Sequence, residues 1–249
     1  MSTHRITNRI VVTAAALAVA ACAPEATVVE EVPLATASTF STTHYALQNR
    51  PDVRGLTGAV SGDHPLAAQA GLRILQEGGN ATDAVIAMAG VLAVVRPHMN
   101  GIGGDAFGIF YEGATGEITA LNASGRAGAV ATPEFFAAAG VSRIPGAGAL
   151  SVSVPGAVAG WVDAHERFGS MDFDYLLEPA IEYARGGFAI STRLAMDFEA
   201  QGNNLNDEGR TLYLPDGAAP PVGTLLINTA LADSLETVAR EGKQGYYNG

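Results

Sequence analysis

The pattern of apolar and polar positions beyond residue 55 predicts a chain with many helices and few strands. Apolar residues recur at helical spacing across positions 65–76, where Pro65 suits the first helical position and Gly78-Gly79 ends the helix. Asn80 then caps a second helix, which is apolar on nearly every side over positions 84–95. Twelve residues are too few to cross a bilayer, so this run predicts a helix buried in a core.

Further elements follow from local signals along the chain. In order, they are a short strand at 58–61, a β-hairpin with strands at 106–111 and 117–122, a helix opened by Thr132-Pro133, a strand at 151–154, a helix from Pro155-Gly156 to Phe168, and helices at 173–185, 191–200 and 228–241. Gly113 and Gly116 supply the hairpin turn. The sequence shows no internal repeat, and the pattern predicts one folded domain over residues 55–249.

Composition allows a sizeable core and argues against several kinds of partner. The chain has 249 residues, of which 48% are hydrophobic and 16% charged, and its formal net charge is −11. An acidic chain repels phosphate backbones, so nucleic-acid binding is not expected. The single cysteine, Cys22, excludes an intrachain disulfide and a Cys-rich metal site. The five histidines lack the spacing of a zinc site, and we expect neither a metal nor a cofactor.

The first 22 residues have the three parts of a lipoprotein signal peptide. Arg5 and Arg9 precede an apolar run at 10–19, which is too short to span a bilayer as a helix. The next residues, Val19-Ala20-Ala21-Cys22, match a bacterial lipobox, in which Cys22 is lipidated and becomes the mature N-terminus. The alternative is an ordinary signal peptide cleaved near Ala21, with Cys22 incidental.

Residues 23–54 are predicted to be a flexible tether. Positions 23–50 are rich in Ala, Thr, Ser, Glu and Pro and lack sustained periodicity. A lipid-anchored domain needs such a connection between its lipidated cysteine and its folded part. We therefore expect an exported protein that faces the periplasm and is held by lipid on Cys22, with the outer membrane as the expected location.

Three segments carry candidate chemistry. Residues 63–84 are interpreted as a capped pair of helices with a structural role. Residues 96–105 contain a glycine-rich loop whose N–H groups can cradle an anion, although no Lys-Ser/Thr follows it as in a nucleotide-binding phosphate loop. Arg126 follows a strand end, directly after Ser124-Gly125, and can grip a carboxylate through two parallel hydrogen bonds. The alternative for Arg126 is a surface arginine in an ion pair.

Taken in this order, the three segments resemble the γ-glutamyltranspeptidase family. The resemblance continues through 153–161 (Ser-Val-Pro-Gly-Ala-Val-Ala-Gly-Trp), 177–188, 213–217 (Tyr-Leu-Pro-Asp-Gly) and 246–249 (Tyr-Tyr-Asn-Gly), and it covers about residues 55–249. Each motif is weak alone, but seven motifs in the right order and at the right spacing are specific.

The resemblance implies the α+β fold of N-terminal-nucleophile hydrolases, a four-layer αββα sandwich that is incomplete in this chain. It also implies a precursor that cleaves itself, so that a threonine at the new N-terminus of the smaller subunit attacks a γ-glutamyl amide such as glutathione. That threonine is absent from this chain. We therefore expect no catalytic residue here, and we expect the remainder of the precursor to be a partner. Arg126 matches the family arginine that binds the α-carboxylate of the glutamyl donor.

Other features keep alternatives open. Asn122-Ala123-Ser124-Gly125 resembles a branch that includes cephalosporin-acylase-like enzymes, so an amide hydrolase of that kind is one alternative, and a non-catalytic lipoprotein scaffold is another. Thr42-Thr43-His44 superficially matches the family's nucleophile motif, but it lies in the tether, and Thr43 is interpreted as a linker residue. Because part of a sandwich lacks its partner layer, apolar faces, including that of the helix at 80–95, are expected to stay partly uncovered.

Overall fold

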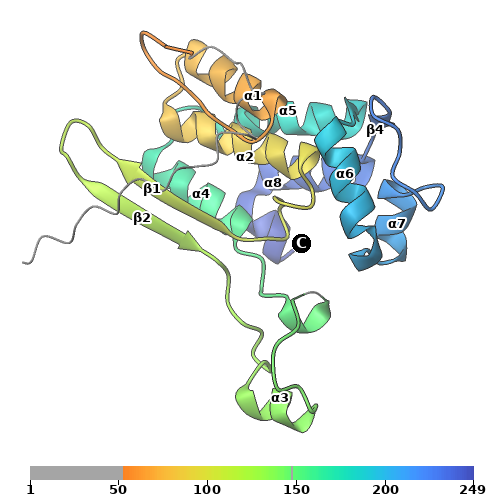
Figure 1. Cartoon of the computed structure of the whole chain (residues 1–249). Coiled ribbons are helices and arrows are strands. Elements are labelled where there is room, and N and C mark those ends of the chain that lie inside the picture. The colour runs from red at the N-terminus through yellow and green to blue at the C-terminus, as the bar shows by residue number, and fades with distance from the viewer. Residues whose placement is uncertain (1–52, 147) are drawn as a thin grey trace, which may run out of the picture. The chain divides into compact units, whose positions relative to one another are not determined.

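The computed structural model describes residues 53–146 and 148–249, and Arg54–Gly249 form one unit (Figure 1). The helices are α1 (Pro65–Gln76), α2 (Ala81–Val95), α3 (Pro133–Ala138), α4 (Ala157–Phe168), α5 (Phe173–Gly186), α6 (Thr192–Gln201), α7 (Asp207–Tyr213) and α8 (Thr229–Tyr247), with short 3-10 turns η1 (Ala149–Ser151) and η2 (Gly202–Asn204). The strands are β1 (Ala106–Tyr111), β2 (Ile118–Ala123), β3 (Phe188–Ala189) and β4 (Leu225–Leu226). Cys22, Thr43 and the predicted signal peptide and tether lie outside the described residues, apart from the last two tether positions.

The core is built around α2, which packs against both α1 and α5, while α5 also packs against α8. All four helices contribute to the largest fully buried apolar side chains, which are Ile74 in α1, Ile86, Val91 and Val95 in α2, Val158 in α4, Leu176 and Leu177 in α5, Ile190 shortly before α6, Leu194 in α6, and Leu235 and Val238 in α8. Such complete burial follows from the composition of α2, because a helix that is apolar on every side has no face suited to water.

The expectation that α2 would stay partly uncovered is therefore wrong for most of the helix. Val85 is the one large hydrophobic residue of α2 that is strongly exposed, at 50%. The reason is that α1, α5 and, to a smaller extent, α4 already pack against α2. The uncovered apolar surface lies on the hairpin instead.

The β1–β2 hairpin is antiparallel, and its register pairs Ala106 with Ala123 and Tyr111 with Ile118. One face packs on α4, where Phe110 stacks on Phe168 with ring centroids 4.8 Å apart. The other face carries Phe107, Ile109, Tyr111 and Ile118, each between 67% and 80% exposed. Figure 1 shows the hairpin beside α4. The hairpin thus has one face covered by a helix and one apolar face open, which is the arrangement of a sheet that lacks a second layer.

Several predicted elements match the structure, and others do not. The helix at 65–76 is confirmed at both ends, and the hairpin strands are confirmed with a one-residue shift in the second. The strands predicted at 58–61 and 151–154 are wrong, because neither segment pairs with another strand in the part of the chain that the structure describes. Helix α7 and the two-residue pair β3–β4 were not predicted, and α8 extends past its predicted end at 241 through a kink at Gly242.

The start of α2 is fixed by a capping box that also reaches the loop between α4 and α5. The Asn80 side chain accepts hydrogen bonds from the N–H groups of Thr82 (2.8 Å) and Asp83 (3.1 Å), and the Asp83 carboxylate accepts from the N–H of Asn80 (2.8 Å). Asp83 is fully buried and accepts further hydrogen bonds from Ser170 N (2.9 Å) and Oγ (2.5 Å). Burial opposes ionisation of this carboxyl, but the hydrogen bonds outweigh it and lower the pKa of Asp83.

Replacing Asp83 with alanine is expected to lower the free energy of unfolding by about 2–3 kcal/mol, because buried N–H donors lose their acceptor. Since the folded-state pKa is lowered, the stabilisation is present above the ordinary value of 3.8 and is lost as the pH falls below it. Urea denaturation between pH 3 and pH 8 measures both effects. The exposed Asp216→Ala is the matched control, expected to change stability by under about 0.5 kcal/mol. Equal losses in the two variants would contradict the assignment.

Replacing Phe107 and Ile109 together with serine is expected to lower the fluorescence of a hydrophobic dye added to the 249-residue chain. The reason is that both side chains belong to the open apolar face of the hairpin. Met196→Ser removes an apolar side chain that is also exposed, at 60%, but lies on α6, and it serves as the control. Unchanged dye fluorescence in the double variant would show that the hairpin face is not the dye-binding surface.

Candidate functional site

Arg126 lies three residues beyond the end of β2 and is exposed. Among the described residues, Arg96, Arg167 and Arg185 each meet a carboxylate, whereas no ion pair is found for Arg126. The alternative in which Arg126 serves as a surface ion-pair partner therefore finds no support within residues 53–146 and 148–249. An unpaired guanidinium keeps its fork of N–H donors free for a carboxylate ligand.

The backbone that carries Arg126 is held against the segment before α4. The carbonyl of Arg126 accepts a hydrogen bond from Val154 N (2.8 Å), and the carbonyl of Ser124 accepts from the Ser153 hydroxyl (3.2 Å). Residues 127–152 thus form a segment that contains α3 and begins and ends beside these hydrogen bonds. The main chain of Arg126 is therefore held in place by hydrogen bonds, while its exposed side chain can rotate to meet a ligand.

The close contact between these two segments depends on glycine. Gly125 has a φ of +77°, and a Cβ added there would lie 1.8 Å from the carbonyl oxygen of Val154. A Cβ at Gly156 would lie 2.2 Å from the carbonyl oxygen of Ala123. Any side chain at either position would push the two segments apart, because such distances are far inside van der Waals contact.

The glycine-rich loop supports the same region from the other side. The carbonyl oxygen of Gly104 accepts hydrogen bonds from the N–H groups of Gly156 (2.9 Å) and Ala157 (3.0 Å), which are the first free donors of α4. The loop therefore offers a carbonyl to the start of α4. Residues of the loop between Pro97 and Asp105 line a pocket of about 380 Å³. The loop thus has a structural role at the start of α4, and the expectation that its N–H groups can cradle an anion stays a prediction.

A buried polar cluster at the base of the loop was missed by the sequence analysis. Asp197 of α6 meets Arg96 (Nη1 to Oδ2, 3.0 Å), His98 (Nε2 to Oδ2, 2.9 Å) and Arg193 (Nε to Oδ2, 3.0 Å). The side chains of Arg96, His98 and Asp197 are each no more than 10% exposed. The His98 contact has the distance of an ion pair but not the angles of a hydrogen bond.

Burial favours the neutral form of the histidine in this cluster. Burial and the neighbouring charge of Arg96 lower the pKa of His98, although Asp197 opposes them. Arg96 also reaches Asp63 (Nε to Oδ2, 2.7 Å) in the segment before α1. The cluster thus joins three segments far apart in the sequence. No sequence pattern indicates such a set, because Arg96 and Asp197, which form its centre, are separated by 101 positions.

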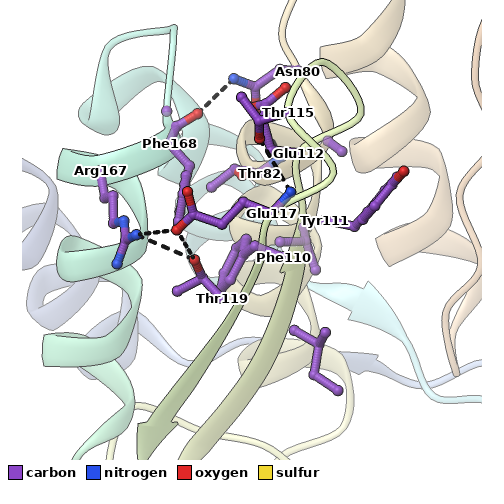
Figure 2. A pocket seen from close by; sticks show the side chains of 14 residues that line it. Asn80, Thr82, Phe110, Tyr111, Glu112, Thr115, Glu117, Thr119, Arg167 and Phe168 are labelled. Carbon is purple, nitrogen blue, oxygen red and sulfur yellow. Dashed lines mark hydrogen bonds and ion pairs between the residues drawn. The ribbon is translucent and has the colours of Figure 1, made fainter. Parts of the chain in front are cut away.

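A separate pocket of about 750 Å³ lies at the turn end of the hairpin (Figure 2). It is bounded by the start of α2, the hairpin turn and the end of α4. Its one arginine, Arg167, is already bonded to Glu117 (3.3 Å) and to Thr119 (3.2 Å). Arg126 lies beyond the opposite end of β2, so about 20 Å of strand separates the two places. The pocket does not combine with Arg126 into one site.

Two other properties of the described residues bear on chemistry. Their His, Asp and Glu side chains form no group of three that could hold a metal ion. None of their helices is both long enough and apolar enough to span a membrane.

Comparison with known proteins places this geometry in context. The family model described as gamma-glutamyltranspeptidase matches residues 67–249. The chain is 38% identical over 203 residues to the glutathione hydrolase-like YwrD proenzyme of Bacillus subtilis (strain 168), a match that covers 79% of this chain and 38% of the relative. It therefore spans less than half the length of that curated relative.

Solved structures give the same result for the fold. The gamma-glutamyltranspeptidase of Helicobacter pylori has a TM-score of 0.75 at 32% identity, over 80% of this chain and 58% of that one. The cephalosporin acylase of Bacillus halodurans has a TM-score of 0.70 at 35% identity, over 81% of this chain and 40% of that one. The predicted α+β fold of the N-terminal-nucleophile hydrolase type, incomplete in this chain, is confirmed.

Proposed function

Because this chain belongs to the gamma-glutamyltranspeptidase family, we propose that it forms the N-terminal part of an exported γ-glutamyltransferase or glutathione hydrolase. In this proposal, residues 1–22 are a lipoprotein signal peptide, residues 23–54 a tether, and residues 55–249 part of the catalytic domain. The substrate is a γ-glutamyl amide such as glutathione. Neither a cofactor nor nucleic acid takes part.

The observation that carries the proposal is the position of Arg126. Its guanidinium is exposed and without an ion pair among the described residues, while its main chain is bonded to Val154 and its neighbour Gly125 packs against the same segment. A donor with a free α-carboxylate would meet two parallel N–H donors of one guanidinium. This holds the substrate by the end that does not react.

The reacting group comes from outside this chain in our proposal. A threonine at the N-terminus of the smaller subunit attacks the amide carbonyl, and its own α-amine takes the hydroxyl proton. The tetrahedral intermediate expels the amine, which leaves with a proton, and an ester remains on the threonine. Water or an acceptor amine then resolves the ester. The 249-residue chain alone is accordingly proposed to be inactive.

The open face of the hairpin supports a partner of this kind. Phe107, Ile109, Tyr111 and Ile118 form an exposed apolar surface on the side of the sheet that faces away from α4. The remainder of the precursor, or the smaller subunit made from it, would cover these side chains with a second sheet. The match to the curated relatives, which covers 38% of one of them, is in keeping with this division.

A second candidate is an amide hydrolase that accepts a glutaryl or related side chain. The likeness to a cephalosporin acylase at 35% identity favours it, together with the residues Asn122 to Gly125 before the arginine. Arg126 would then hold the distal carboxylate of the acyl group. Both candidates use the same guanidinium, so one set of variants tests both.

Arg126→Ala in the complete gene product is expected to lower kcat/KM for carboxylate-bearing donors by about a hundredfold, because two charge-assisted hydrogen bonds are lost. The loss should lie mainly in KM, since the contact holds the ground state and the transition state alike. Arg126→Lys should recover only part of the loss, since an ammonium lacks the guanidinium fork. Initial rates with γ-glutamyl and glutaryl anilides provide the measurement.

The exposed Arg143, in the segment 127–152 that follows Arg126, provides the matched control as Arg143→Ala and should keep the original rate. The 249-residue chain alone is the blank, with no hydrolysis above background. If Arg126→Ala kept full efficiency on every carboxylate-bearing donor, the assignment of Arg126 as the carboxylate-binding residue would be wrong.

Lipid attachment is tested separately. Bacteria that express the protein and are fed a tagged fatty acid should label the original chain and not Cys22→Ser, because the lipid is joined to that cysteine. Fractionation should then place the labelled chain with the outer membrane. Equal labelling of both proteins would rule out the lipoprotein hypothesis and favour an ordinary signal peptide.

A further inference from the structure

The helix α4 begins without a side-chain cap of its own. Its cap residue is Gly156, which offers no side chain to the first turn. The N–H groups of Gly156 and Ala157 are satisfied by Gly104, and the next inward donor with a partner from outside the helix is Ala159. That partner comes from the far end of the chain.

Tyr247, the last residue of α8, takes the place of the missing cap. Its hydroxyl donates to the carbonyl oxygen of Pro155 (2.7 Å) and accepts from the N–H of Ala159 (3.2 Å). One phenol group therefore bonds to the residue before α4 and to the first turn of α4 at once. Pro155 has no N–H, so its carbonyl is the one main-chain group through which it can be held.

The neighbouring Tyr246 holds the other side of the same region. Its hydroxyl donates to the carbonyl oxygen of Ile102 in the glycine-rich loop (2.8 Å). The two rings meet edge to face with centroids 4.8 Å apart. The loop that binds the start of α4 through Gly104 is thus attached to the same pair of tyrosines.

The tyrosines reach this position because α8 is not straight. Gly242 has φ 56° and ψ −135°, which breaks the helix and redirects its last residues. Lys243 then pairs with Asp163 of α4, and Glu166 lies 3.9 Å from the same ammonium. The last residues of α8 are therefore fixed to α4 by an ion pair as well as by Tyr247.

These contacts form a short path from Tyr247 to Arg126. The Tyr247 hydroxyl holds Pro155; the preceding residue, Val154, donates its N–H to the carbonyl of Arg126 (2.8 Å). Gly125 and Gly156 allow the two segments to touch. Because Pro155 follows Val154 directly, a shift of Pro155 also shifts Val154 and, through its hydrogen bond, the main chain that carries the Arg126 side chain.

We infer that Tyr247 is a positioning residue that sets the place of Arg126, and through it the affinity for a carboxylate-bearing donor. The inference rests on the proposed role of Arg126. Tyr247 does not touch the substrate in this account; it holds the segment that holds the arginine.

Tyr247→Phe in the complete gene product removes the hydroxyl and keeps the ring. KM for the carboxylate-bearing donor is expected to rise about three- to tenfold with kcat unchanged, as for the loss of one or two hydrogen bonds. In the background of Arg126→Ala, the same substitution should not raise KM further, because its effect is exerted through Arg126. Tyr175→Phe is the matched control, since that hydroxyl donates to Glu77 (2.7 Å) at a different place in the fold.

Each outcome decides one question. An unchanged KM in Tyr247→Phe, or an equal rise in KM with and without Arg126, would overturn the role of Tyr247. No effect of Arg126→Ala on any donor would instead overturn the proposed function. Peptide-level hydrogen exchange of the same protein separates positioning from loss of stability. Faster exchange confined to residues 153–160 supports positioning, and faster exchange that also includes α2 would show a general loss of stability and contradict it.

Discussion

The close approach between the end of β2 and the start of α4 sets the position of the hairpin and of Arg126. The hydrogen bond from Val154 to Arg126 needs the two backbones in contact, and side chains at Gly125 or Gly156 would prevent it. Farther along the same contact, a Cβ at Gly160 would lie 2.6 Å from the Cβ of Ala123. These glycines therefore set the distance between the hairpin and α4, and with it the position from which the Arg126 side chain extends.

This constraint separates the stable part of the chain from the open part. On the inner side of the hairpin, α4 connects the sheet to the core formed by α1, α2, α5 and α8. On the outer side, the exposed aromatic and aliphatic residues have no counterpart among the described residues. Within this core the contact between α1 and α2 joins consecutive helices and can form early in folding, whereas the contacts of α5 with α2 and with α8 join helices that are separated by other elements. The open apolar face of the hairpin is the part of the domain that another layer would have to bury.

Local signals explain how much could be predicted from the sequence. The ends of α1 and the cap of α2 follow from proline, glycine and asparagine at fixed positions, and the hairpin follows from alternation around its turn glycines. The segments at 58–61 and 151–154 looked like strands for the same reason. These two predictions were wrong because a strand requires a hydrogen-bonded partner strand. In the segment 152–154, the N–H of Val154 donates one hydrogen bond to the carbonyl of Arg126, and no ladder follows.

The candidate site was less predictable than the fold, for a related reason. Arg126 was found through motifs that resemble a family, since nothing local distinguishes a carboxylate-binding arginine from a surface one. Tyr247 meets Pro155 across 92 positions of sequence, and Arg96 meets Asp197 across 101. Such contacts are set by the topology of the folded chain and leave no periodic trace in the sequence.

The size of a pocket is also a poor guide to the site in this chain. The pocket of about 750 Å³ has its arginine neutralised by Glu117, while Arg126 has its donors free on an open surface. An open surface of this kind becomes a pocket only when another part of the protein covers it. The exposed apolar face of the hairpin is suited to bind such a part. The charge that would bind substrate and the apolar surface that would complete the site therefore lie on the same hairpin and the segment that continues it, which places recognition and assembly under one structural constraint.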